Sequence, residues 1–95
     1  MIRAYYQDNR PAAKQALKRA IEIPVEVYAS TQRLLRLAES LTTTVPARYR
    51  VDLQCAVALA RAAGEAARLL VMTNLVWLGD RTYRLHTQHK LARLR

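Results

Sequence analysis

Residues 47–78 form a long, alanine-rich stretch that contains no proline. Alanine has the highest helix propensity of the amino acids, and four alanines recur at the spacing of one helical face, at positions 56, 60, 63 and 67. We therefore expect a long helix from Ala47 to about Leu78, with a stripe of small side chains that lets another helix approach closely. Gly64 lies within it and fits either a tight crossing point or a tolerated helix interior.

A first helix is predicted ahead of this stretch. Asp8 or Asn9 can cap its N-terminus, and Pro11 suits its first turn because a proline there lacks an N–H that would have no partner. This helix runs to about Glu22. Pro24 then removes one backbone hydrogen bond and disfavours the helical conformation of the preceding residue, so it either kinks the helix or starts a new one.

A second helix is predicted to about Thr42, because apolar residues recur three and four positions apart. The segment Thr42–Pro46 is the clearest break in the chain, since β-branched threonine disfavours helix. Gly79 ends the long third helix, and Asp80 caps a short basic segment over residues 81–95. The predicted fold class is all-α: an antiparallel up-and-down bundle of three main helices plus a short basic C-terminal helix.

The composition favours a small oligomeric protein. Ninety-five residues allow one helical domain, 1–95, and a chain of this size buries only about 60–65% of its unfolded surface. We therefore expect oligomerisation to complete the domain. Residues 69–78 are too short to span a bilayer, which takes about 20 residues, and the N-terminus lacks the apolar core of a signal peptide. These features predict a cytoplasmic protein with no membrane partner.

Sixteen Lys and Arg residues against seven Asp and Glu give a formal net charge of +9, which attracts polyanions. One function class is therefore a basic helical-bundle adaptor that binds RNA or DNA within a nucleoprotein assembly. Most charged helical faces are only solvated, which is the alternative for these residues. The candidate phosphate contacts are Arg10, Lys14, Lys18, Arg81, Arg84, Lys90 and Arg93.

Several distinct motifs follow one another over residues 16–80. An alanine–glutamate–proline passage occupies Ala20–Pro24, a leucine-rich helix follows it, Asp52 opens the long helix, and Asn74 with Leu75 lies near its end. In this order the segment resembles the C-terminal half of the formimidoyltetrahydrofolate cyclodeaminase and methenyltetrahydrofolate cyclohydrolase family. The resemblance implies a helical fold and a tetrahydrofolate derivative as the possible ligand.

The resemblance also implies roles for two residues. Asp52 is the candidate catalytic carboxylate, because this chemistry moves protons around a cationic one-carbon bridge. Its alternative role is that of a first-turn acid at the positive end of a helix dipole. Asn74 is the candidate ligand-binding residue, and its alternative roles are to bridge two helices or to face solvent.

Departures from the family pattern weaken the polar site. The glycine-rich loop expected ahead of this segment is missing, Val45–Pro46 replaces a Gly–Asn turn, and Leu70 replaces the first of two expected asparagines. We therefore expect a non-catalytic subunit or remnant that is not active alone, working as a homo-oligomer or with a complementing protein chain. If active, it would be a cyclodeaminase or cyclohydrolase acting on a one-carbon tetrahydrofolate.

Other chemistry has little support in the sequence. His86 and His89 are three residues apart, but no cysteine or acid follows at a spacing that would complete a metal site, so no metal is predicted. Cys55 falls among alanine and valine, where we expect a small buried residue rather than a nucleophile. No glycine-rich phosphate loop is present.

Overall fold

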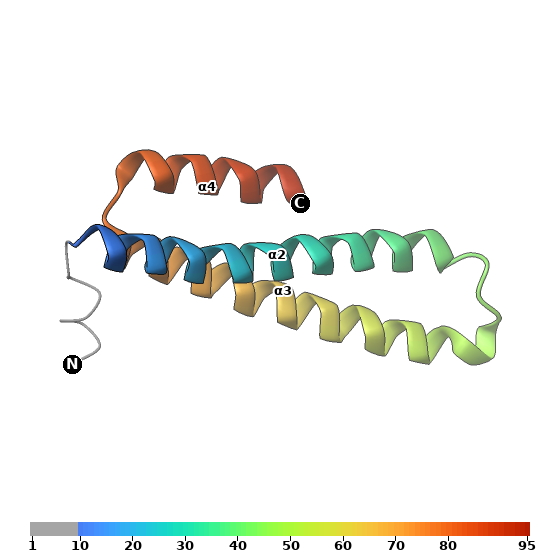
Figure 1. Cartoon of the computed structure of the whole chain (residues 1–95). Coiled ribbons are helices and arrows are strands. Elements are labelled where there is room, and N and C mark those ends of the chain that lie inside the picture. The colour runs from blue at the N-terminus through green and yellow to red at the C-terminus, as the bar shows by residue number, and fades with distance from the viewer. Residues whose placement is uncertain (1–9) are drawn as a thin grey trace.

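A computed structural model describes residues 10–95, which are helical almost throughout and contain no β-strand (Figure 1). The elements in chain order are α2 (Pro11–Leu41), a single 3₁₀ turn η1 (Ala47–Tyr49), α3 (Arg50–Leu78) and α4 (Arg81–Leu94). Helix α3 folds back along α2 with extensive contact between them, and α4 returns along the first half of α2. The all-α prediction is confirmed.

Helix α2 runs without a break through Pro24. The two helices expected on either side of this proline are therefore one helix, and the described residues form two long helices and the short α4. Packing explains the continuity, because Leu17, Ile21, Val25 and Tyr28 are buried on one face before and after the proline. A helix that broke here would separate these contacts, which are worth more than the one backbone hydrogen bond that proline removes.

The ends of the helices follow local chemistry. Pro46 occupies the N-cap position of η1, and regular α-helix begins only at Arg50, three residues later than predicted. Gly79 ends α3 in the left-handed conformation, with φ of 69°, as a glycine allows. Asp80 then caps α4, because its side chain accepts a hydrogen bond from the backbone N–H of Tyr83 at 3.0 Å. The N-cap of α2 is Arg10; Asp8 and Asn9 lie outside the described residues.

The core is a narrow seam between α2 and α3, joined by Leu91 of α4. Its most deeply buried side chains are Ile21, Val71 and Leu75. Trp77 packs against this core and is partly buried. The other buried members of the seam are Leu17, Val25, Tyr28, Ala67 and Leu78.

Gly64 marks the closest approach of the two long helices. A β-carbon built on it would lie 2.7 Å from Oγ1 of Thr31, which is too close for an ordinary contact. Thr31 is itself buried, and its hydroxyl donates to the carbonyl oxygen of Tyr28 at 2.8 Å. Of the two interpretations left open by the sequence, the tight crossing point is the one that the structure supports.

Candidate functional site

Asp52 lies in the first turn of α3, at the end of the hairpin where α2 and α3 are joined. It is exposed to solvent. The N-terminus of a helix carries partial positive charge, so a carboxylate here is stabilised by its position alone. The placement matches the structural role that the sequence offered as an alternative to catalysis.

Asn74 lies near the opposite end of α3 and is partly buried between Met72 and Leu75. It is 22 residues from Asp52 on one continuous helix, which at 1.5 Å per residue separates them by about 33 Å. Leu70, at the position of the first expected asparagine, is 58% exposed. One chain therefore does not bring the two candidate site residues together.

A polar groove of about 300 Å³ lies between α2 and α4. Glu22 and Glu26, one turn apart on α2, face Tyr83, His86 and Lys90 of α4 across it. Burial raises the pKa of the Tyr83 hydroxyl, the negative charge of Glu22 raises it further, and a hydrogen bond with Thr87 partly offsets both.

This groove was not predicted from the sequence. More than fifty residues separate its two walls along the chain, and only the spacing of Glu22 and Glu26 hinted at a shared face. His86 lines the groove, whereas His89 is not among its lining residues. Within residues 10–95, no group of three or more His, Cys, Asp or Glu side chains is placed to hold a metal ion.

A second groove, of about 340 Å³, lies at the joined end of the hairpin beyond the reach of α4. Its polar lining residues are Thr42, Arg50, Gln54 and Arg61, and its apolar ones are Leu53, Val57 and Ala58. Two guanidinium groups beside apolar carbon suit an anion with an apolar part. Neither arginine was among the predicted contacts, and Asp52 does not line this groove.

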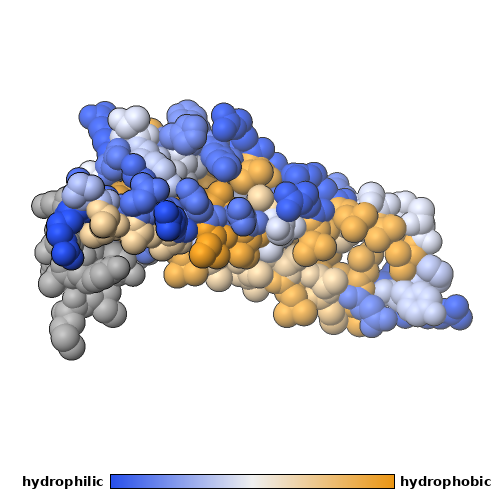
Figure 2. Space-filling model, in the orientation of Figure 1, coloured by the Kyte–Doolittle hydropathy of each residue, from blue (hydrophilic) through white to orange (hydrophobic). Residues whose placement is uncertain are grey.

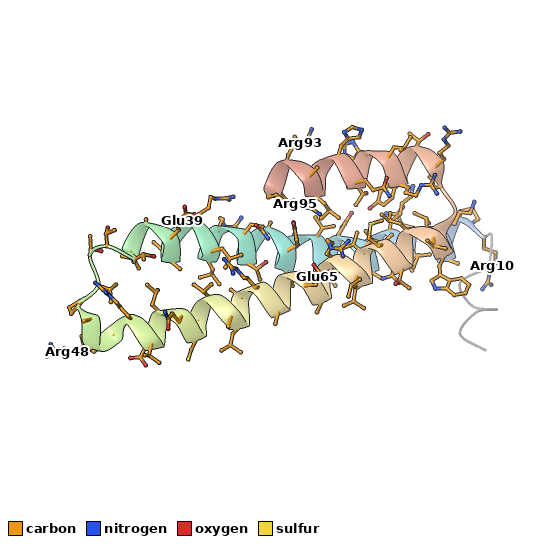
Figure 3. All side chains as sticks on the ribbon, turned by 180° about the vertical axis from the view of Figure 1, so that it is seen from behind. Arg10, Glu39, Arg48, Glu65, Arg93 and Arg95 are labelled. Atoms are coloured by element: carbon orange, nitrogen blue, oxygen red, sulfur yellow. The ribbon has the colours of Figure 1, made fainter. Side chains whose placement is uncertain are left out.

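The basic residues predicted to contact phosphate lie near the start of α4 or near its end. Lys18 pairs with Asp80 at 3.8 Å and lies 5.1 Å from the ring centre of Tyr83, so the start of α4 rests against the first turns of α2. In Figure 3 Arg10 lies at this end of the molecule, whereas Arg93 lies at the far end of α4. At that far end Arg36 of α2 donates to the carbonyl oxygen of Leu94 at 3.3 Å.

Glu65 and Arg68, one turn apart on α3, form a two-pronged ion pair with contacts of 2.6 and 3.1 Å. The hydrogen bond from Arg68 lowers the pKa of Glu65, and the charge of Arg95 lowers it slightly more. In Figure 3 Arg95 lies above Glu65, which places the end of α4 over this part of α3. The pair is a surface contact within α3 rather than a reactive site.

Cys55 is exposed, so the prediction of a small buried residue is wrong at this position. Positions 53, 57 and 60 of α3 are partly buried on the side of α2, and residue 55 lies about half a turn away from them.

Residues 5–93 match the family model described as formiminotransferase-cyclodeaminase. The chain belongs to the formiminotransferase-cyclodeaminase family. The match spans nearly the whole chain and confirms the resemblance seen over Ala16–Asp80. No curated protein and no solved structure matches the chain significantly.

The sequence resemblance implies a tetrahydrofolate derivative as the ligand, and the described residues of one chain do not form a complete site for it. The candidate carboxylate and the candidate amide are about 33 Å apart. Neither Asp52 nor Asn74 lines any of the described grooves. No helix within residues 10–95 combines the length and apolar character needed to cross a membrane.

Proposed function

We propose that this chain is a cytoplasmic, non-catalytic subunit of the folate-dependent cyclodeaminase and cyclohydrolase type. The family match over residues 5–93 supports the type. The observation that carries the non-catalytic part is the separation of about 33 Å between Asp52 and Asn74 along α3. The subunit works with another protein chain, which is a complementing chain or a further copy of itself.

The chemistry explains why this separation matters. Cyclodeaminase and cyclohydrolase reactions need a group that moves protons at a cationic one-carbon bridge and orients water. Such a group acts only within about 3 Å of the proton it transfers, or through one bridging water. Asp52 is exposed to bulk solvent at the joined end of the hairpin, with no second candidate residue within that reach. It therefore holds the start of α3 rather than transferring protons.

The test is turnover by the purified chain. Hydrolysis of methenyltetrahydrofolate is followed by absorbance, and deamination of formimidoyltetrahydrofolate is followed by the release of ammonia. Both assays use protein concentrations of up to about 50 µM, so that weak catalysis can be detected. We expect rates equal to those of buffer and of the Asp52→Asn variant. Turnover that saturates with substrate and disappears in Asp52→Asn would contradict the non-catalytic assignment. Calorimetry with the same folates then reports whether binding persists without turnover.

A second candidate function is the binding of RNA or DNA. The observation that favours it is the contact of Lys18 on α2 with Asp80 and Tyr83 of α4, because Lys14, Arg81 and Arg84 lie within four residues of this contact along the chain. Phosphate contacts predict that log affinity falls linearly with log salt, by about 0.9 for each duplex phosphate neutralised. Binding that is absent, or that does not change with salt, would exclude this function.

A further inference from the structure

The groove between α2 and α4 carries opposite charges on its two walls. Glu22 and Glu26 lie on the α2 wall, and Lys90 lies on the α4 wall. Two carboxylates and one ammonium leave one net negative charge, on a chain whose formal net charge is +9. Figure 2 shows hydrophilic surface over α4 and the adjoining part of α2, whereas hydrophobic surface lies along the seam of α2 and α3. The groove is therefore a local negative site on a strongly basic protein.

The charged walls of this groove do not neutralise each other. Within residues 10–95, no ion pair joins Glu22 or Glu26 to a basic side chain. Lys18, one turn before Glu22, pairs instead with Asp80 at 3.8 Å, and it does not line the groove. The two carboxylates are therefore available to a ligand.

The charge of Glu22 acts on the opposite wall. Burial raises the pKa of the Tyr83 hydroxyl most, and the negative charge of Glu22 raises it further, although Tyr83 lies on the other helix. A hydrogen bond with Thr87 acts in the opposite direction. A charge that disfavours a phenolate across the groove favours a cation in the same space, because the Coulomb interaction is the same with its sign reversed.

The groove is elongated, because α4 runs in the same direction as α2 (Figure 1). The first turn of α4 contacts α2 at Lys18, and its end contacts α2 at Arg36. The order of residues along one wall therefore matches the order along the other, so Lys90 lies toward the end of the groove where Glu26 stands. At 1.5 Å per residue, the α4 wall from Tyr83 to Lys90 is about 10 Å long. These dimensions suit an elongated ligand rather than a single ion.

Buried side chains lie between the charged groups. Val25 of α2 and Thr87 of α4 both line the groove, and they are 6% and 5% exposed. Val25 also belongs to the core, so its position is fixed by packing on both sides. The volume of about 300 Å³ is at the lower end of the range for small-molecule sites. A short methylene chain with charged ends fits this combination of lining groups.

We propose that this groove binds a basic amino acid, which carries two cationic groups and one carboxylate. The side-chain cation pairs with Glu22 and the α-ammonium pairs with Glu26. The carboxylate pairs with Lys90, and the methylene chain lies over Val25. One net positive charge on the ligand complements one net negative charge in the groove. The inference goes beyond the proposed function and does not rest on the folate assignment, so a chain without folate turnover or binding would leave it unchanged.

The experiment is a titration of the full chain with L-lysine hydrochloride at neutral pH and constant ionic strength, followed by the amide shifts in two-dimensional NMR spectra. Exposed charge pairs are weak, so we expect a dissociation constant of about 1 mM, with shifts concentrated in residues 22–26 and 83–90. Glu22→Gln/Glu26→Gln should raise the dissociation constant about tenfold. The matched control is Glu39→Gln, at an exposed position of the same helix outside the groove, which should leave it within about twofold.

Cadaverine is L-lysine without its carboxylate, so it tests the role of Lys90. Lys90→Gln should weaken L-lysine about fivefold but should not weaken cadaverine, because it removes a like charge from that ligand. His89→Gln, on the same helix and outside the groove, should change neither. The absence of shifts at about 20 mM L-lysine would overturn the proposal. So would Lys90→Gln affecting both ligands alike, or Glu39→Gln weakening binding as much as the groove variant.

Discussion

Replacing Gly64 with alanine tests the close approach of α2 and α3. In an ordinary helix this change stabilises by about 1 kcal/mol, because glycine has a poor helix propensity. Here the added β-carbon would lie 2.7 Å from Oγ1 and 3.4 Å from Cβ of Thr31. Thr31 cannot simply rotate away, since it is buried and its hydroxyl bonds to the carbonyl oxygen of Tyr28. The new methyl group therefore forces the helices apart or breaks that hydrogen bond.

The magnitude follows from two opposing effects. Overpacking a well-packed site costs about 1–3 kcal/mol. Subtracting the propensity gain of about 1 kcal/mol leaves a net destabilisation of about 1 kcal/mol for Gly64→Ala. For a domain of this size, such a loss lowers the melting temperature by about 4–8 °C.

The assay is thermal unfolding followed by circular dichroism at one fixed chain concentration, because association would otherwise shift the melting temperature. The matched control is the same change in a Thr31→Ala background, which removes Oγ1 and the methyl group beside it. There Gly64→Ala should stabilise by about 1 kcal/mol, so the sign of its effect reverses. Stabilisation by Gly64→Ala with Thr31 still present would refute the tight crossing.

Three further changes probe α4 and the surface of α3. Asp80→Ala should lower stability by about 1 kcal/mol and speed amide hydrogen exchange in α4, because it removes the cap on the N–H of Tyr83; Asp80→Ser should restore most of the loss. Absorbance titration should show Tyr83 ionising above the usual pKa of about 10, and Glu22→Gln should bring that pKa down. The folded chain then holds this proton longer than the unfolded one, so stability falls as the pH rises from the ordinary tyrosine pKa through the raised one. Glu65→Gln should leave the urea midpoint almost unchanged, because the pair with Arg68 is exposed; a large drop would show that it holds the fold.

The helix ends could be predicted from the sequence because local chemistry sets them. Gly79 supplies the left-handed residue that ends α3, and Asp80 supplies the side-chain acceptor that starts α4. Pro46 occupies the N-cap of the 3₁₀ turn that precedes the regular helix. These features depend on a few neighbouring residues and need no knowledge of the rest of the fold.

Pro24 shows where local rules do not decide. The proline disfavours helix at its own position, yet the buried residues on either side keep α2 continuous against α3. The same is true of Cys55, whose apolar neighbours in sequence predicted burial although its own direction on α3 is outward. In both cases the packing partner of the helix determines the outcome.

The roles of the two candidate site residues stay predictions, and the grooves of the structure could not be predicted from the sequence. Asp52 and Asn74 were assigned from the family pattern, and the length of a single helix between them already implied a wide separation. The groove between Glu22 and His86 joins residues more than sixty positions apart, and it depends on how α4 folds back. No local pattern carries that information.

The proposed function needs a second protein chain, and a further copy of this chain along the open side of the α2–α3 hairpin, away from α4, is the first partner to test. Small-angle X-ray scattering of the full chain measures both the mass and the longest dimension. Pairing along that side predicts twice the 10.8 kDa of one chain and a longest dimension still close to the 55 Å of a single hairpin. A mass of one chain, or a dimer with a much greater length, would contradict it.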